Sequence, residues 1–194
     1  MSRQSDLFDG DRTPQPTDRL FFAIYPDSAA ATQIAHLAKH LRDEHELKGA
    51  PLALDRFHVT LHHLGDHEGL PPTLVAAAQE AGAAISESTF DAAFDYVASF
   101  RTSARNRPFV LRGSKGLAPL MAFQQAIGMA MKKAGLGRWV QPQFTPHVTL
   151  LYDDHLVGEQ TVEQVSWTVR EFVLVHSLLG RTQHIPLGRW SLRG

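Results

Sequence analysis

One tetrapeptide occurs twice in this chain, as His58-Val59-Thr60-Leu61 and as His147-Val148-Thr149-Leu150. Its β-branched residues and apolar surroundings are typical of a strand. Because side chains alternate between the two faces of a strand, the histidine and the threonine of each copy share one face. Each copy therefore presents an imidazole and a hydroxyl group to one surface and two apolar side chains to a core.

Two such strands that face each other place a pair of histidines, His58 and His147, on opposite sides of one cleft. The unperturbed pKa of histidine, about 6.5, lies near neutral pH, so that one ring can donate a proton while the other accepts one. Such a pair can also bind a phosphate group without a metal ion. One histidine and threonine on a strand usually have a structural role, whereas two identical copies at matched positions favour a functional one.

The segments before the two copies are also alike. An apolar strand pattern around Phe21 lies 37 positions before His58 (58 − 21), and a similar pattern around Phe109 lies 38 positions before His147 (147 − 109). Between each such strand and its tetrapeptide, apolar residues recur every three or four positions, which predicts a helix. The repeated order indicates two β-α-β halves related by a pseudo-twofold axis, which brings the two histidine strands together.

Turn and capping residues bound the expected elements. The first helix is expected to begin at Asp27 or Ser28 and to end at Gly49 and Pro51, and the first histidine strand is expected to end at Gly65-Asp66. The other expected helices cover about 72–85 and 117–134, and the other expected strands are 19–25, 90–97, 108–112, 147–152, 169–178 and 185–192.

These patterns predict an α+β fold with two pseudo-symmetric β-α-β lobes, antiparallel sheets that face a central cleft, and helices on the outside. A length of 194 residues fits a single domain made of two such lobes. We assign residues 19–194 to this domain. Residues 1–18 are polar and lack hydrophobic periodicity, so they are expected to form a disordered tail.

The composition excludes several kinds of site. The chain has no cysteine, which rules out disulfides, thiolate-bound zinc, iron–sulfur clusters and thiol nucleophiles. No apolar run approaches the roughly 18 to 20 residues of a membrane span, and the N-terminal region lacks the apolar segment of a secretory signal. We therefore expect a cytoplasmic protein with no membrane partner. We also expect a monomer without a cofactor.

The net charge of −1 is unevenly distributed along the chain. No acidic residue lies between Asp95 and Asp153. This basic stretch holds Arg101, Arg105, Arg107, Arg112, Lys115, Lys132, Lys133 and Arg138. A segment of one sign gives one side of a molecule a positive potential that attracts phosphate-bearing ligands. Because the stretch leads into the second tetrapeptide, it favours an anionic substrate.

A metal site is an alternative near the first tetrapeptide, where possible ligands crowd at His58, His62, His63, Asp66, His67 and Glu68. However, His58 and His62 are four residues apart on a strand, about 13 Å at roughly 3.3 Å per residue, which is too far to share an ion. The sequence therefore predicts no metal site. His62 is expected on the face of His58, at the rim of the cleft or exposed, and Asp153-Asp154 is expected to form a solvated turn.

The paired motifs, with the strand Arg-Leu-Phe-Phe-Ala-Ile at residues 19–24, resemble those of the 2H phosphoesterase superfamily. Over about residues 19–192, the chain looks like the bacterial RNA 2′,3′-cyclic phosphodiesterases, historically named 2′-5′ RNA ligases. The segments Phe57–Leu61 and Phe144–Leu150 match the family's motif contexts closely. A single His-x-Thr would be a weak signal, but the pair is specific.

The resemblance implies metal-independent hydrolysis of RNA or nucleotide 2′,3′-cyclic phosphate ends, with reverse 2′-5′ ligation as a side activity. RNA ends or cyclic nucleotides would then be the partners. In the family, the first histidine donates a proton and the second accepts one, and these roles fall on His58 and His147. The motif threonines bind the phosphate oxygens, and they correspond to Thr60 and Thr149.

The chain departs from the family pattern at Tyr152, where many relatives carry an arginine that contacts the substrate. Tyr152 itself, or Arg112 or another member of the basic stretch, is expected to take over this contact. A module that binds RNA ends or nucleotides without turnover is the alternative to an enzyme. Retention of both histidines and both threonines favours the enzyme, because binding alone would need basic residues more than a titrating pair.

Overall fold

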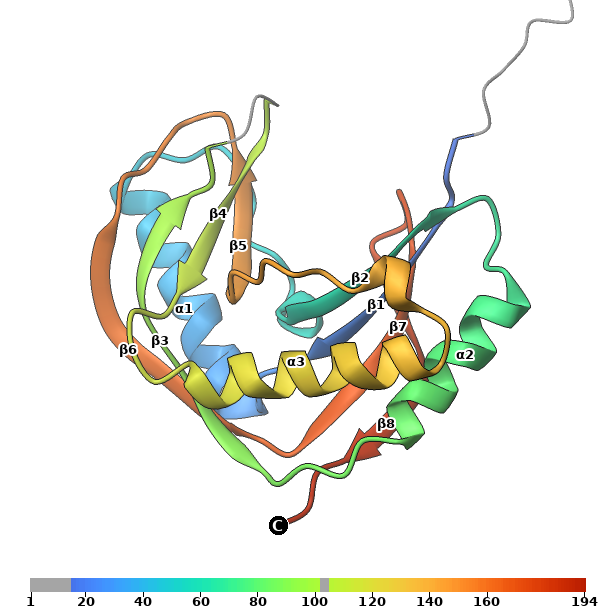
Figure 1. Ribbon diagram of the computed structural model, residues 1–194. Helices are drawn as coiled ribbons and strands as arrows, with labels where there is room; N and C mark the ends of the chain where they lie inside the picture. Colours follow the sequence, from blue (N-terminus) through green and yellow to red (C-terminus); the bar gives the residue numbers. More distant parts are fainter. Residues whose placement is uncertain (1–14, 102–104) are drawn as a thin grey trace, which may run out of the picture.

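The computed structural model describes residues 15–101 and 105–194. Two antiparallel four-stranded sheets, with strand orders β2-β1-β7-β8 and β5-β4-β3-β6, form two lobes (Figure 1). The strands are β1 (Asp18–Ile24), β2 (Val59–His67), β3 (Phe90–Ser99), β4 (Arg107–Arg112), β5 (His147–Asp153), β6 (Gln160–Val169), β7 (Glu171–Leu178) and β8 (Gln183–Ser191). The helices are α1 (Ser28–Glu44), α2 (Pro72–Ala83) and α3 (Ala118–Lys133), with short 3-10 helices η1 (Leu54–Arg56) and η2 (Gly137–Trp139). The predicted two-lobed α+β fold is confirmed.

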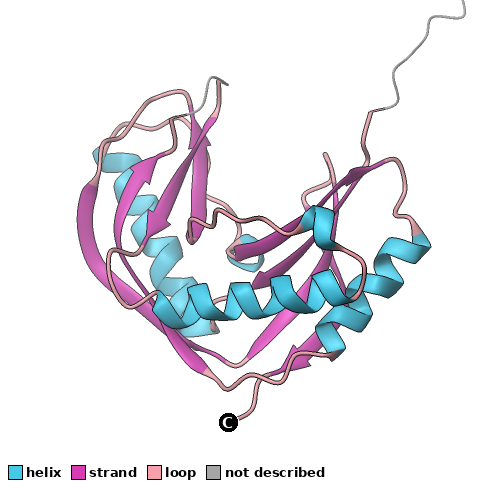
Figure 2. Cartoon of the chain, in the orientation of Figure 1, coloured by secondary structure: helices cyan, strands magenta, loops and turns pink. Residues whose placement is uncertain are grey.

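The two halves of the chain exchange their helices. Helix α1 follows β1 of the first sheet but packs against β5 and β6 of the second. Helix α3 follows β4 of the second sheet; it contacts β3 of that sheet, and it also packs against α2 and against β2 of the first (Figure 2). Each histidine strand nevertheless pairs antiparallel with the strand that precedes its helix, β2 with β1 and β5 with β4. The exchange ties the two lobes into one unit.

Strand β1 is buried on both faces, which explains its continuous apolar sequence. Leu20, Phe22 and Ile24 belong to one large core shared by both lobes and their helices. Phe21 and Ala23 point to the other face, where they form a smaller apolar cluster with residues of β7. The helices therefore cover one face of the first sheet, and its opposite face borders the space between the lobes.

Helix α1 begins as expected, because the Asp27 side chain accepts a hydrogen bond from the backbone nitrogen of Ala30 at 2.9 Å. It ends earlier than expected, at Glu44 instead of near Gly49. Gly49 has another role: an added Cβ would lie 2.0 Å from the backbone oxygen of Tyr152, so only glycine permits this approach. The loop after α1 is thereby packed against the end of β5.

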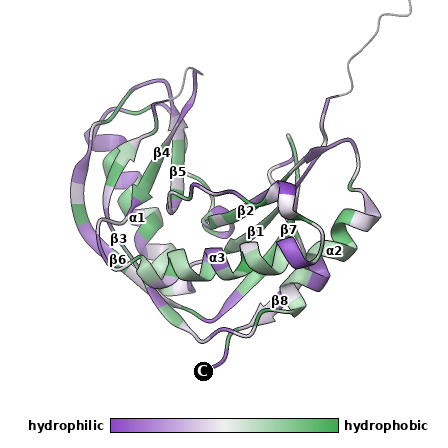
Figure 3. Cartoon of the chain, viewed as in Figure 1, coloured by the Kyte–Doolittle hydropathy of each residue, from purple (hydrophilic) through white to green (hydrophobic). Residues whose placement is uncertain are grey.

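Two strand predictions differ from the structure. The single strand expected at 169–178 is the second of two strands, which meet near Arg170 and belong to different sheets. The first, β6, was missed because it lies at a sheet edge and its sequence is rich in polar residues, as the hydrophilic segments along it show (Figure 3). Strand β2 also continues through Gly65, whose φ of 99° suits glycine, as far as His67.

Strand β1 begins one residue before the predicted start of the domain. Residues 1–14 of the expected tail lie outside the described residues. Asp18, assigned to the tail, is the first residue of β1, and the backbone nitrogen of Thr17 bonds to the oxygen of His67 at 2.9 Å. Within the described parts of the chain, no helix is long and apolar enough to cross a membrane.

Candidate active site

The two motif histidines are held by matching hydrogen bonds. His58 immediately precedes β2 and His147 begins β5. The Nδ1 atom of each ring lies 2.7 Å from the backbone oxygen two residues earlier, that of Arg56 or Thr145. Because a carbonyl oxygen can only accept, each Nδ1 carries a proton and donates it. The atom left free for proton transfer is therefore Nε2 in both rings.

One cavity of about 430 Å³ contains both histidines and both motif threonines. The residues at the starts of β2 and β5 come from opposite lobes, so the pseudo-twofold arrangement places one imidazole and one hydroxyl on each side. The structure thus brings together the four residues singled out in the sequence. The rest of the lining consists of Arg19, Phe21, Leu52, Arg56, His63, Tyr152, Ser177 and His184.

Both rings are neutral at neutral pH when the cavity holds no anion. Burial lowers the pKa of His58 to about 4, and the positive charges of Arg56 and of a protonated His147 act in the same direction. Burial also lowers the pKa of His147, to which Arg112 contributes. An anion bound between the rings would oppose both effects and favour their protonated forms.

A matched β-bulge shapes the two sides of the cavity. In the pairing of β2 with β1, the register skips Leu61, and in the pairing of β5 with β4, it skips Leu150. A bulge shifts the alternation of side chains by one residue. As a result, the fifth residue after each histidine, His63 or Tyr152, lines the cavity. The predicted position of Tyr152 at the site therefore agrees with the structure, although its role stays a prediction.

The same bulge makes the prediction for His62 wrong. Instead of sharing the face of His58, its side chain is turned into the core and is 0% exposed. Its Nε2 lies 2.9 Å from the backbone oxygen of Gln124, and its Nδ1 lies 3.4 Å from the backbone nitrogen of Gln141. Nε2 therefore donates and Nδ1 accepts, so the neutral ring links β2 to α3 and to the loop before β5.

We expect His62→Ala to lower the free energy of unfolding by about 2 to 4 kcal/mol, because it leaves a cavity in the core and removes the ring's hydrogen bonds to the backbone of Gln124 and Gln141. Urea unfolding measures this quantity. The matched control is His63→Ala on the cleft side of the same strand, where we expect a loss below about 1 kcal/mol. Equal losses for the two variants would contradict the structural role of His62.

The basic stretch does not supply the cationic lining of the cavity. None of its residues is among the side chains that line it; the arginines there are Arg19 and Arg56. Arg112 is paired with His147 in the sheet but lies over the rings of Tyr96 and Phe100, with its guanidinium carbon 5.1 and 5.9 Å from their centroids. Arg112 therefore lies beside the cavity and not among the side chains that line it, and its contact with the substrate stays a prediction.

The acidic turn after β5 is also different from the expectation. Asp154 is exposed, but Asp153 is buried, and its carboxylate accepts hydrogen bonds from the backbone nitrogens of Lys48, Gly49 and His155 at 2.6 to 2.8 Å. It therefore fixes the loop after α1 to the end of β5. Among the residues that the structure describes, no group of three or more His, Asp or Glu side chains could hold a metal ion.

His184 is a fourth histidine of the cavity, after His58, His147 and His63, and the sequence did not reveal it. Its ring packs edge-on against His58, with centroids 5.1 Å apart, and its Nδ1 lies 3.2 Å from the hydroxyl of Tyr25. Burial lowers the pKa of His184 to about 3, so the ring is neutral. It comes from β8, far from His58 in the sequence, and no motif marks it.

The presence of Arg19 and Phe21 in the cavity could have been predicted from the sequence. They alternate with the core residues of β1, so they occupy the cavity face of that strand. The guanidinium of Arg19 makes two hydrogen bonds of 2.7 Å to Asp66, and it lowers the pKa of that carboxyl to about 2. Its charge is thus already paired within the protein.

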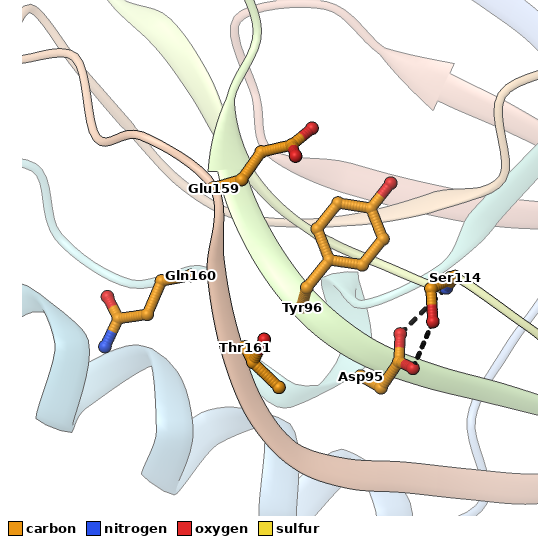
Figure 4. A pocket seen from close by; sticks show the side chains of 6 residues that line it. All are labelled: Asp95, Tyr96, Ser114, Glu159, Gln160 and Thr161. Carbon is orange, nitrogen blue, oxygen red and sulfur yellow. Dashed lines mark hydrogen bonds between the residues drawn. The ribbon is translucent and has the colours of Figure 1, made fainter.

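A separate hollow lies beside β3 and β6 in the second lobe (Figure 4). The carboxylate of Asp95 accepts hydrogen bonds from the backbone nitrogen and the hydroxyl of Ser114 at 2.8 and 2.5 Å. Glu159 adds a second carboxylate, and no histidine lines this hollow. The acid and base pair therefore belongs to the cavity between the lobes.

Comparison with known sequences gives a consistent result. The profile of the 2′-5′ RNA ligase superfamily matches residues 25–181. The RNA 2′,3′-cyclic phosphodiesterase of Escherichia coli strain K12 is 32% identical over 185 residues, which cover 90% of this chain and 96% of that protein.

Solved structures show the same fold. Escherichia coli LigT in its apo form has a TM-score of 0.67 at 28% identity, covering 93% of this chain and 100% of LigT. LigT in complex with 3′-AMP, with the same coverage and identity, has a TM-score of 0.66. The protein TT0787 of Thermus thermophilus has a TM-score of 0.70 at 21% identity, covering 91% and 98% of the two chains, and this likeness concerns the fold alone.

Proposed function

Because the chain belongs to the 2′-5′ RNA ligase superfamily, we propose that it hydrolyses the 2′,3′-cyclic phosphate ends of RNA or of nucleotides to phosphomonoesters. The observation that carries this proposal is the cavity in which two histidines from pseudo-symmetric strands each keep Nε2 free. The substrate class follows that of the curated relative from Escherichia coli.

In this reaction, a water molecule attacks phosphorus while the bond from phosphorus to one ribose oxygen breaks. His147 takes the proton of the water on its Nε2, and His58, protonated at Nε2, gives a proton to the departing ribose oxygen. In-line attack requires the two groups on opposite sides of phosphorus, and strands from opposite lobes can supply them. The low pKa of His58 means that it gains its proton as the anionic substrate binds.

Thr60 and Thr149 line the same cavity, and each hydroxyl can donate a hydrogen bond to a non-bridging phosphate oxygen. Donors placed where negative charge develops stabilise the transition state.

Tyr152, 43% exposed at the mouth of the cavity, is placed to contact the nucleoside. With the 5′-hydroxyl of a second RNA as the nucleophile in place of water, the same groups would break the bond from phosphorus to the 3′ oxygen and form a 2′-5′ linkage. A monomeric state and a cytoplasmic location stay predictions.

We expect the purified protein to open a short RNA that ends in a 2′,3′-cyclic phosphate at an unchanged rate when a chelator is present, because both proton transfers use histidine. Mass spectrometry of the product, with a 3′-phosphate RNA as the unreactive control, checks this. Turnover that vanishes with chelator and returns with a divalent ion would contradict the two-histidine mechanism. Tight binding of the cyclic end without any turnover would instead identify a binding module.

A further inference from the structure

A second hollow, of about 310 Å³, adjoins the cavity on the first lobe, and His184 lines both. Its floor consists of Val173 and Val175, which are buried members of the small apolar cluster on β7. Tyr25 and Pro186 line it as well. Apolar surfaces beside an aromatic ring are what a nucleobase needs for its flat faces.

The hollow also contains charged groups suited to a nucleotide. Arg189 lies there, paired with Glu171 at 2.6 Å, and both side chains are about half exposed. An exposed pair of this kind contributes little stability, so Arg189 can exchange Glu171 for a phosphate. Asp55 lies at the same hollow and is exposed, where a carboxylate can accept hydrogen bonds from the edge of a base.

Arg56 provides the strongest indication of a ligand. Its Nε and Nη1 atoms are buried, and within the described residues neither has a hydrogen-bond partner. Buried polar atoms without partners are rare in native proteins, and an anion that accepts from them would remove the cost. Arg19, the other arginine of the cavity, is by contrast already paired with Asp66.

Arg56 is also placed where the cavity and the hollow meet. It lines the cavity, its backbone oxygen holds the ring of His58, and its charge acts on Tyr25 and His184, which border the hollow. The unpaired donors of Arg56 therefore belong to the part of the site through which a ligand at His58 would continue into the hollow.

We propose that this hollow binds the nucleotide that precedes the cyclic end in an RNA chain, and that Arg56 holds the phosphate joining the last two nucleotides. The proposal rests on the proposed function, which places the terminal cyclic phosphate between His58 and His147. A terminal nucleotide continues into the RNA only through its 5′ oxygen, so the next phosphate lies one ribose away from the reacting one. The enzyme is then adapted to oligonucleotides instead of cyclic mononucleotides.

Three substrates separate the contributions: adenosine 2′,3′-cyclic phosphate, the same compound with a 5′-phosphate, and the dinucleotide ApA ending in a 2′,3′-cyclic phosphate. We expect the 5′-phosphate to raise kcat/KM about tenfold, mainly through a lower KM, since a charge-assisted pair supplies an effect of this size. The second nucleoside should raise it further. Titration calorimetry with adenosine 3′-phosphate, adenosine 3′,5′-bisphosphate and ApA 3′-phosphate measures the same increments without turnover.

Variants of Arg56 and Pro186 test which residue causes the gain in kcat/KM from the 5′-phosphate and which causes the gain from the second nucleoside. Arg56→Gln should remove most of the gain from the 5′-phosphate, and Arg56→Lys should restore part of it, because the charge returns without the planar donors. Pro186→Glu, at an exposed edge-strand position, should remove the gain from the second nucleoside. Arg181→Gln, an exposed arginine of the same lobe that lines neither hollow, is the matched charge control and should change no increment.

Equal kcat/KM and equal affinity across the three compounds would overturn this inference. It would also fail if Arg56→Gln lowered all three values by the same factor, since Arg56 would then hold the reacting phosphate. Failure of the proposed function has a different signature: the wild-type protein would hydrolyse none of the three substrates, whereas the calorimetric increments would still decide whether the hollow binds a second nucleotide.

Discussion

His58→Ala and His147→Ala should each lower kcat for a 2′,3′-cyclic phosphate end by about a thousandfold or more, since positioned acid or base groups contribute about 10² to 10⁴. Each variant removes a motif imidazole whose Nε2 the backbone leaves free for proton transfer. Both rings border a cavity, so their loss opens no void in the main core, and the fold should persist. Single-turnover kinetics measures the loss, and circular dichroism checks the fold.

The matched control is His36→Ala, at an exposed position of α1, which should retain full activity. Thr60→Val and Thr149→Val should have smaller effects than either histidine variant, because each removes one donor and leaves both proton transfers in place. If either histidine variant kept more than about a tenth of the wild-type rate, the loss would be below about 1.4 kcal/mol. The assignment of that histidine as acid or base would then be wrong.

The repeated tetrapeptide was sufficient to predict the two lobes and the meeting of the two histidine strands. Strand alternation correctly placed each histidine beside its threonine, because those residues precede the bulge. After the bulge, the expected alternation of side chains placed His62 on the wrong face of β2. A bulge inserts one residue without a sequence mark of its own, so the pattern of Leu61-His62-His63 could not show that His62 enters the core.

Long-range packing explains the other differences. The exchange of α1 and α3 leaves the spacing between strand, helix and histidine strand unchanged, so sequence spacing cannot detect it. Arg112 was predicted to contact the substrate because it belongs to the basic stretch. In the structure, its guanidinium lies over the rings of Tyr96 and Phe100, beside the cavity. Arg56 lies outside the basic stretch, and its importance follows from burial and from the absence of partners among the described residues. Neither property can be read from composition.

The pH dependence of kcat/KM should have its maximum below pH 6.5. This parameter reports the free enzyme, in which burial lowers the pKa of both rings and brings that of His58 to about 4. The productive form carries one proton on the pair. Raising the pH above the higher of the two macroscopic pKa values removes this proton, and lowering it below the other adds a second, so the rate falls on both sides.

The profile of kcat, which reports the enzyme with substrate bound, should lie at higher pH than that of kcat/KM. The phosphate anion between the rings stabilises their protonated forms and therefore raises both pKa values. Arg112→Gln provides a matched test, because removing its charge raises the pKa of His147 and should move the kcat/KM profile toward higher pH without altering the cavity lining. A kcat/KM maximum above pH 7, or a kcat profile at lower pH than that of kcat/KM, would mean that the two buried imidazoles are not the groups that transfer protons.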